Sequence, residues 1–91
     1  MNPDLYEDVL LEPEQVMVSS KQIILYNDDF NTFDFVIESL VKVCKHEYEQ
    51  AVQCTYLVHY KGKCSVKNGT YEELQSICDA LLRRGLTAEI I

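Results

Sequence analysis

The stretch that decides the fold runs from residue 22 to residue 36 and reads QIILYNDDFNTFDFV. Its first part, Gln22 to Tyr26, is short, β-branched and apolar, which predicts a strand that is buried on both faces. The polar run from Asn27 to Asn31 predicts a turn, after which a helix begins with Asn31 as its N-cap. Asp34, three residues later, suits the positive end of the helix dipole. The stretch therefore predicts a strand, a polar turn and a helix in direct succession.

Helix and strand signals alternate along the rest of the chain. Gly62 suits the left-handed stop of a helix, and Thr70 with Glu73 forms a capping box that opens another helix. Alternation of apolar and polar residues from Lys63 to Lys67 predicts a half-buried strand. The full set after residue 36 is a break at 45–47, a helix at about 48–59, a strand at 63–67, a turn at 68–69, a helix from 70 to Gly85 and a strand at 87–91.

The order of these elements predicts a fold. The second and third strands flank a helix, which favours a parallel, right-handed crossover between them. That crossover leaves a gap in which the first strand can pair antiparallel to both others. We therefore predict an α+β two-layer sandwich of order β-α-α-β-α-β, with a three-stranded sheet packed against three helices.

Length and charge divide the chain into two parts. Ninety-one residues form one small domain with a thin core. Residues 1–20 hold five acids, both prolines and no Lys or Arg, whereas residues 21–91 hold ten acids against eight bases. We expect an acidic, flexible N-terminal tail at 1–20 and a domain at 21–91. An ordered edge segment is the alternative for the tail, because it also contains apolar clusters.

Composition also excludes several classes of function. The net charge of −7 argues against nucleic acid as a partner, since phosphate binding needs a basic face. The cysteines show no CxxC spacing, which gives no support to zinc or thioredoxin chemistry, and Cys44, Cys54 and Cys78 read as small core residues. No signal peptide and no membrane-length apolar run is recognised. We expect a reduced, cytoplasmic protein without membrane contact, cofactor or metal.

Four polar residues from two separate segments are the candidate site. Asn27, Asp28 and Asp29 follow the first strand, and His59 lies near the end of the second helix. Carboxylate, amide and neutral imidazole acceptors suit a small cation such as a protonated amine. Taken singly, the triplet is a helix-entry turn and the histidine a helix-end residue. A metal or acid–base site built from Asp28, Asp29 and His59 is a further alternative.

Two motifs in register resemble the ClpS adaptors. The stretch 22–36 is similar to that family's opening signature, an apolar strand followed by NDD, an aromatic residue and a helix with FV. Residues 57–63, LVHYKGK, are similar to its second signature. The resemblance covers roughly residues 21–91 and implies a monomeric, non-enzymatic adaptor. Such adaptors bind substrates whose first residue is a bulky hydrophobe, the N-degron, and deliver them to a Clp-type AAA+ unfoldase and its peptidase.

The resemblance also implies roles for individual residues. Asn27, Asp29 and His59 would hold the substrate's α-amino group, with Asp28 in support, and Glu72 would contribute to docking on the unfoldase. The pocket for the first side chain would involve Leu25, Tyr26, Asn31, Phe33, Val36, Thr55, Val58 and Ala88.

The chain departs from the family pattern at several of these positions. Asn31, Thr32 and Phe33 stand where a small polar residue, a proline and a methionine are usual, and Thr55 replaces a second methionine. Ala88 aligns near a usual leucine, the third helix is about one turn shorter, and a docking lysine aligns near Ile77. These departures predict a reshaped pocket. They leave open a ClpS-like interaction scaffold that does not bind degrons.

Overall fold

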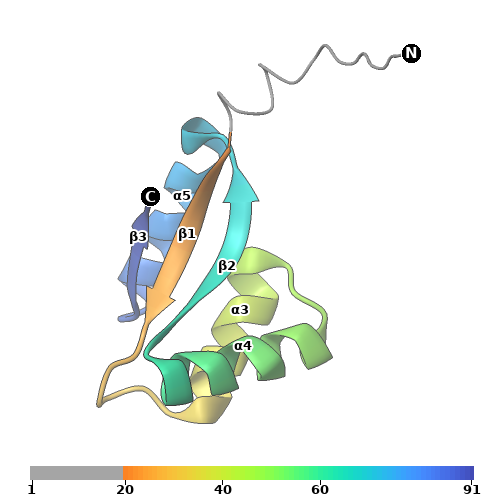
Figure 1. Cartoon of the computed structure of the whole chain (residues 1–91), viewed down its shortest axis with the longest axis vertical. Coiled ribbons are helices and arrows are strands. Elements are labelled where there is room, and N and C mark those ends of the chain that lie inside the picture. The colour runs from red at the N-terminus through yellow and green to blue at the C-terminus, as the bar shows by residue number, and fades with distance from the viewer. Residues whose placement is uncertain (1–19) are drawn as a thin grey trace, which may run out of the picture.

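The computed structural model describes residues 20–91, which form three strands and three helices (Figure 1). The predicted tail lies outside the described residues, apart from Ser20. In chain order the elements are β1 (Lys21–Tyr26), α3 (Phe33–Cys44), α4 (Tyr48–Lys61), β2 (Lys63–Gly69), α5 (Tyr71–Arg83) and β3 (Thr87–Ile90). Within this part of the chain, no helix has the length and apolar composition needed to cross a membrane.

The sheet has the predicted topology. Its strand order is β2-β1-β3, and β1 pairs antiparallel with both neighbours. Leu25 on the central strand lies opposite Cys64 on one side and Ala88 on the other. The register with β2 shifts between Ile23 and Ile24, which leaves Val66 as an extra residue on β2. The α+β prediction with a central antiparallel strand is therefore confirmed.

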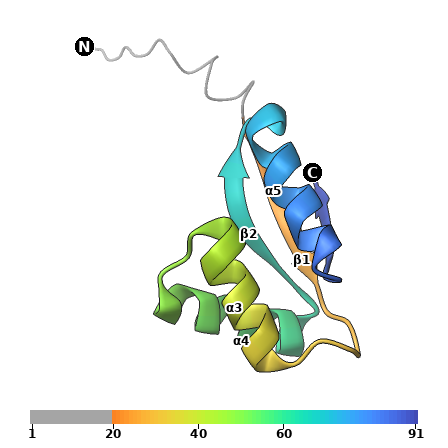
Figure 2. The ribbon, with the colours of Figure 1, turned by 180° about the vertical axis from the view of Figure 1, so that it is seen from behind.

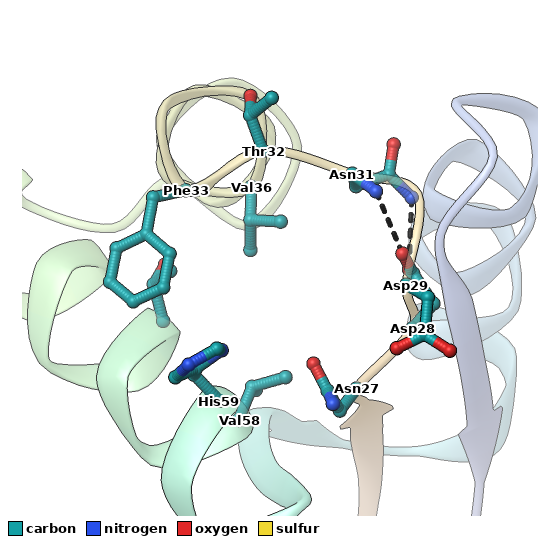
Figure 3. A pocket seen from close by; sticks show the side chains of 10 residues that line it. Asn27, Asp28, Asp29, Asn31, Thr32, Phe33, Val36, Val58 and His59 are labelled. Atoms are coloured by element: carbon teal, nitrogen blue, oxygen red, sulfur yellow. Dashed lines mark hydrogen bonds between the residues drawn. The ribbon is translucent and has the colours of Figure 1, made fainter.

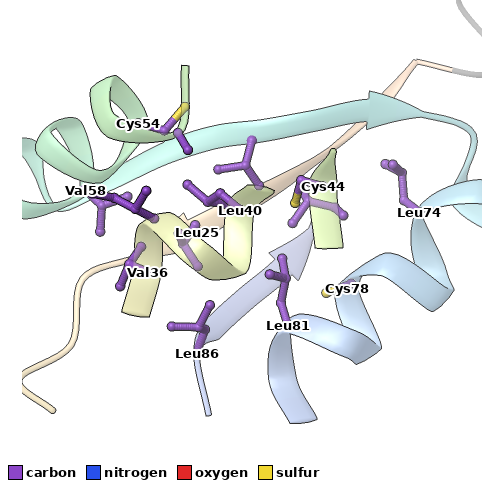
Figure 4. Close-up of a cluster of buried hydrophobic side chains, with 14 residues drawn as sticks. Leu25, Val36, Leu40, Cys44, Cys54, Val58, Leu74, Cys78, Leu81 and Leu86 are labelled. Atoms are coloured by element: carbon purple, nitrogen blue, oxygen red, sulfur yellow. The ribbon is translucent and has the colours of Figure 1, made fainter. Parts of the chain in front are cut away.

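The helices cover one face of this sheet. Figure 2 shows α3 and α5 lying over that face, with α4 beside α3 and leading into β2. The core between the layers is apolar (Figure 4), and its largest fully buried side chains are Ile23, Leu25, Leu40, Leu74 and Leu81. This is the thin single core expected of so short a chain.

The predicted core cysteines Cys44, Cys54 and Cys78 are all buried. Burial raises the pKa of the Cys44 thiol to about 11 and that of the Cys54 thiol to about 12. Such thiols stay protonated at neutral pH and act as small apolar residues.

Some of the predicted helix caps and turns are confirmed, and others lie at different residues. The capping box of Thr70 and Glu73 forms, and Gly62 ends α4 with a φ of 92°. The N-cap of α3 is Thr32 rather than Asn31, because the Thr32 hydroxyl accepts the Phe35 amide at 3.1 Å. The predicted turn at residues 68–69 instead belongs to β2, since these residues pair with residues 21–22 of β1.

The core predicts a strong dependence of stability on Leu40. This side chain is fully buried between α3 and the sheet. Leu40→Ala should lower the free energy of unfolding by about 2–5 kcal/mol, because it removes buried methyl groups and leaves a cavity. Urea denaturation measures this loss. The matched change Leu82→Ala, at a leucine that is 47% exposed, should cost less than about 1 kcal/mol, and equal losses in the two variants would contradict the assigned core.

Candidate functional site

The site forms where the end of β1 meets the end of α4. The Asn27 backbone N–H donates to the Gly62 carbonyl at 3.0 Å, directly beyond the pair of Tyr26 with Lys63. Gly62 in turn donates its N–H to Val58 at 3.0 Å, which closes the last turn of α4. This turn also carries His59. The two sequence motifs are therefore brought to one rim of the domain by backbone hydrogen bonds.

A pocket of about 360 Å³ opens at this rim (Figure 3). In Figure 3 the N-terminal end of α3 and the end of α4 form one side, and the loop between β1 and α3 forms the other. Polar groups from the loop and an apolar floor therefore face the same space. The lining residues are Asn27, Asp28, Asp29, Asn31, Thr32, Phe33, Val36, Thr55, Val58 and His59.

Asp28 holds the loop in shape. One carboxylate oxygen accepts the backbone amides of Phe30 and Asn31, both at 2.8 Å, and the other accepts the Asn31 side-chain amide at 2.9 Å. The Asn31 amide also donates to the Gly85 carbonyl at 3.0 Å. Burial alone would raise the pKa of Asp28, but the hydrogen bonds from Asn31 and Phe30 outweigh it and the net pKa is lowered. Asp28 is thus an ionised structural residue of the loop.

The other three polar groups are differently placed. Within residues 20–91, no hydrogen bond engages the side chains of Asn27, Asp29 or His59, and all three residues are exposed. They supply a carboxamide oxygen, a carboxylate and an imidazole nitrogen at the mouth of the pocket. This combination can accept several hydrogen bonds from one small cation.

Aromatic and aliphatic side chains build the opposite wall. The Phe33 ring stands edge-on to the rings of Tyr56 and His59, with centroid separations of 5.0 and 5.2 Å. Val36 and Val58 are buried beside it. The buried Thr55 hydroxyl donates to the Ala51 carbonyl at 2.8 Å, so it brings no unpaired polar group into the pocket.

Three residues predicted for the pocket do not line it. Leu25 is a core residue that is 1% exposed, and Ala88 lies beside it in the sheet. The Tyr26 hydroxyl donates to the Glu89 carboxylate, because alternation along β1 points it away from Leu25. Leu25 and Tyr26 instead border a small cavity of about 20 Å³, which shares Val36 and Val58 with the pocket.

Leu86 is the residue that the sequence analysis missed. It is 4% exposed and reaches the small cavity, whereas Ala88 does not. Its position directly after Gly85, which has a φ of 90°, was the available signal. A leucine that follows a left-handed turn is well placed to fold back onto the core.

The remaining predictions concern docking and metals. Glu72 is exposed in the first turn of α5, which begins where β2 ends, at the opposite end of the sheet from the pocket (Figure 1). In the described part of the chain, no three His, Cys, Asp or Glu side chains gather in a way that could hold a metal ion.

Comparison with known proteins agrees with this architecture. Residues 18–89 match the family described as "ATP-dependent Clp protease adaptor protein ClpS". The chain belongs to the ClpS family. The family description names an adaptor of a protease rather than an enzyme, in agreement with the prediction of a non-catalytic protein.

Individual ClpS proteins show the extent of the likeness. The adapter from Thermosynechococcus vestitus is 39% identical over 67 residues, which cover 72% of this chain and 71% of that protein. The adapter from Vibrio cholerae is 42% identical over 57 residues, which cover 59% of this chain but 54% of the relative. Matches to several such relatives span only about half of their length.

A solved structure shows the same fold. Agrobacterium tumefaciens ClpS2 bound to L-phenylalaninamide superimposes with a TM-score of 0.74, covering 81% of this chain and 96% of that one. The two sequences share 18% identity, so this likeness establishes the fold.

The hydrogen bonds of Asp28 predict a pH-dependent stability. Because its pKa is lower in the folded protein, this carboxylate stabilises the fold above the unfolded pKa of about 3.9 and loses that effect as the pH falls through the folded value. Asp28→Ala should therefore lower the melting temperature by a few degrees at pH 7, as the loss of a capping side chain does. The gap from wild type should close at strongly acidic pH. Asp29→Ala is the control, and an equal loss at pH 7 would contradict the assigned role of Asp28.

Proposed function

We propose that this protein is a substrate adaptor that binds the first residue of a polypeptide through its free α-amino group and a bulky apolar side chain. The observation that carries the proposal is that the polar side chains at the pocket differ in their hydrogen bonds. The Asp28 carboxylate accepts hydrogen bonds from the loop. Within the described residues, the side chains of Asn27, Asp29 and His59 form none, and they lie above an apolar floor. The adaptor then passes the bound protein to a Clp-type unfoldase.

The chemistry of an N-terminus fits the polar rim. An α-amino group has a pKa of about 7.7–8.0 and is largely cationic at neutral pH. It carries three donors, and the rim offers three separate acceptors, of which the Asp29 carboxylate makes the stronger, charge-assisted bond. An acetylated or internal residue lacks the positive charge and leaves acceptors unpaired, at a cost of about 1–3 kcal/mol.

The apolar part fits a single side chain. A pocket of about 360 Å³ lies at the small end of the range for ligand sites, and its floor is formed by Val36 and Val58 with Phe33 as one wall. Burying a Leu or Phe side chain there would contribute roughly 1.5–3 kcal/mol. Requiring both a free amine and a large apolar side chain gives so small a domain its selectivity.

The comparisons support the same ligand class. ClpS2 from Agrobacterium tumefaciens is bound to L-phenylalaninamide, a molecule with a free α-amino group and an aromatic side chain. The pocket of this chain pairs cation acceptors with an apolar floor, which suits both parts of such a ligand.

Delivery is proposed from membership of the family of Clp protease adaptors. Glu72, at the far end of the domain from the pocket, is the candidate for contact with the unfoldase. A docking surface at that end would leave a bound substrate accessible.

The first test compares peptides that differ only in the amine. A fluorescent peptide beginning with Leu or Phe should bind, and its acetylated form should not, because the cation is lost. Asp29→Ala and His59→Ala should each weaken binding about ten-fold or more without unfolding the domain. The readout is fluorescence anisotropy, with circular dichroism to verify the fold.

Asp79→Ala is the matched control, since it removes an exposed carboxylate from α5, a helix that contributes no residue to the pocket lining. Its affinity should equal that of the wild type. Equal affinity for free and acetylated peptides would rule out recognition of N-termini and would favour an interaction scaffold.

The second test concerns the Phe33 wall. An aromatic ring adapts less readily than a methionine, so the wild type should bind one of Leu or Phe clearly better than Trp. Phe33→Met should reduce the spread of affinities among peptides that begin with Leu, Phe and Trp. Phe30→Met, at an aromatic residue outside the pocket that is 92% exposed, should leave the ranking unchanged. If Phe33→Met also leaves it unchanged, Phe33 does not contact the first side chain.

A further inference from the structure

Two exposed tyrosines stand on α4 beside the pocket. Tyr56 and Tyr60 lie one helical turn apart and are 47% and 70% exposed. Their rings are stacked, with a centroid separation of 5.8 Å and an interplanar angle of 6°. Large apolar groups gathered at the surface of a small domain commonly mark a binding surface. The stack presents such a surface with a fixed orientation.

The stack is continuous with the pocket wall. The Tyr56 ring meets the edge of Phe33 at 5.0 Å, and the Tyr60 ring meets His59 at 4.9 Å. Phe33 and His59 both line the pocket. The four rings therefore form one cluster, of which two line the pocket and two extend its wall along α4.

We propose that the Tyr56–Tyr60 stack is a subsite for the second side chain of the bound polypeptide, and that it favours an aromatic or large aliphatic residue. The inference rests on the proposed function, because it needs a first residue anchored at Asn27, Asp29 and His59. In an extended chain the next Cα lies only 3.8 Å away, and its side chain points to the opposite side. The second side chain is thus kept out of the pocket and lies on its rim, where a ring-sized group beside His59 meets the tyrosines.

The chemistry of the surface sets the class of residue. The stack offers aromatic faces and edges, which bind other rings and aliphatic groups. The exposed Lys61 follows Tyr60 directly, and the exposed Lys63 lies two residues further along the chain. Their positive charge disfavours a cationic second residue. On the loop side of the pocket, Phe30 is 92% exposed and forms no ring contact within the described residues. Of the two sides of the pocket, only the α4 side thus presents packed aromatic rings within the described residues.

The experiment measures how the second residue affects affinity. Three peptides with a free amine begin Leu-Ala, Leu-Phe and Leu-Arg and are otherwise identical. The full chain should bind Leu-Phe about three- to ten-fold more tightly than Leu-Ala, the range expected for one aromatic contact. Leu-Arg should not exceed Leu-Ala. Fluorescence anisotropy gives each dissociation constant.

Variants then assign the preference to the stack. Tyr56→Ala should weaken Leu-Phe more than Leu-Ala and bring their ratio close to one, while Tyr56→Phe keeps the ring and should keep the ratio. Phe30→Ala, the matched loss of an exposed aromatic residue on the loop side, should leave the ratio as in the wild type. Melting temperatures verify that each variant is folded.

Several results would overturn the inference. Equal affinity of the wild type for Leu-Ala and Leu-Phe would do so, as would tighter binding of Leu-Arg than of Leu-Phe. A ratio that survives Tyr56→Ala, or is lost in Phe30→Ala, would place the preference elsewhere. An equal loss for both peptides in Tyr56→Ala would show that the ring only supports Phe33. If no free-amine peptide binds at all, the proposed function itself fails and the subsite with it.

Discussion

The hydrogen bond from the Asn27 amide to the Gly62 carbonyl joins the two halves of the site. It continues the β1–β2 ladder by one step into the turn that ends α4, so the exit of the first strand is fixed against the exit of the second helix. Neither motif has a function by itself, since one is a polar turn and the other a helix end. Their chemistry depends on this registration, in which the two segments share a rim that neither could form alone.

A second set of contacts fixes the loop between β1 and α3. Asp28 and Asn31 fix its backbone, and Asn31 fastens it to the Gly85 carbonyl. Close by in the sequence, Arg84 donates to the Ser39 hydroxyl at 2.8 Å and lies 4.8 Å from the centre of the Phe35 ring, which holds the end of α5 against α3. A site prepared in this way loses less conformational entropy on binding. These contacts also explain why the Asp28 carboxylate has a structural role, while the adjacent Asp29 carboxylate is free, within the described residues, to accept hydrogen bonds.

Local signals in the sequence predict most of the fold. The apolar run before Asn27, the capping box at Thr70 and the glycine at residue 62 each act over a few residues, and each appears in the structure where its pattern places it. The N-cap of α3 moved to Thr32 because the Asn31 side chain is taken by Asp28 and Gly85, and Gly85 lies 54 residues away. At Leu86, by contrast, the left-handed turn at Gly85 is a local signal that the next side chain folds back onto the core. The contact between Asn31 and Gly85 has no counterpart in local periodicity or propensity.

The hydrogen bond from the Asn31 side chain to the Gly85 carbonyl has a consequence for folding during synthesis. On the ribosome, the loop that bears Asn27 to Asn31 is synthesised early, yet its fastening point emerges more than fifty residues later. The central strand likewise waits for β3, and the backbone of Gln22 is paired in both directions with Ile91. Contacts between distant segments form only after both have been made. A nascent chain therefore cannot fasten the loop that borders the pocket until Gly85 has left the ribosome, and its sheet stays incomplete until β3 has followed.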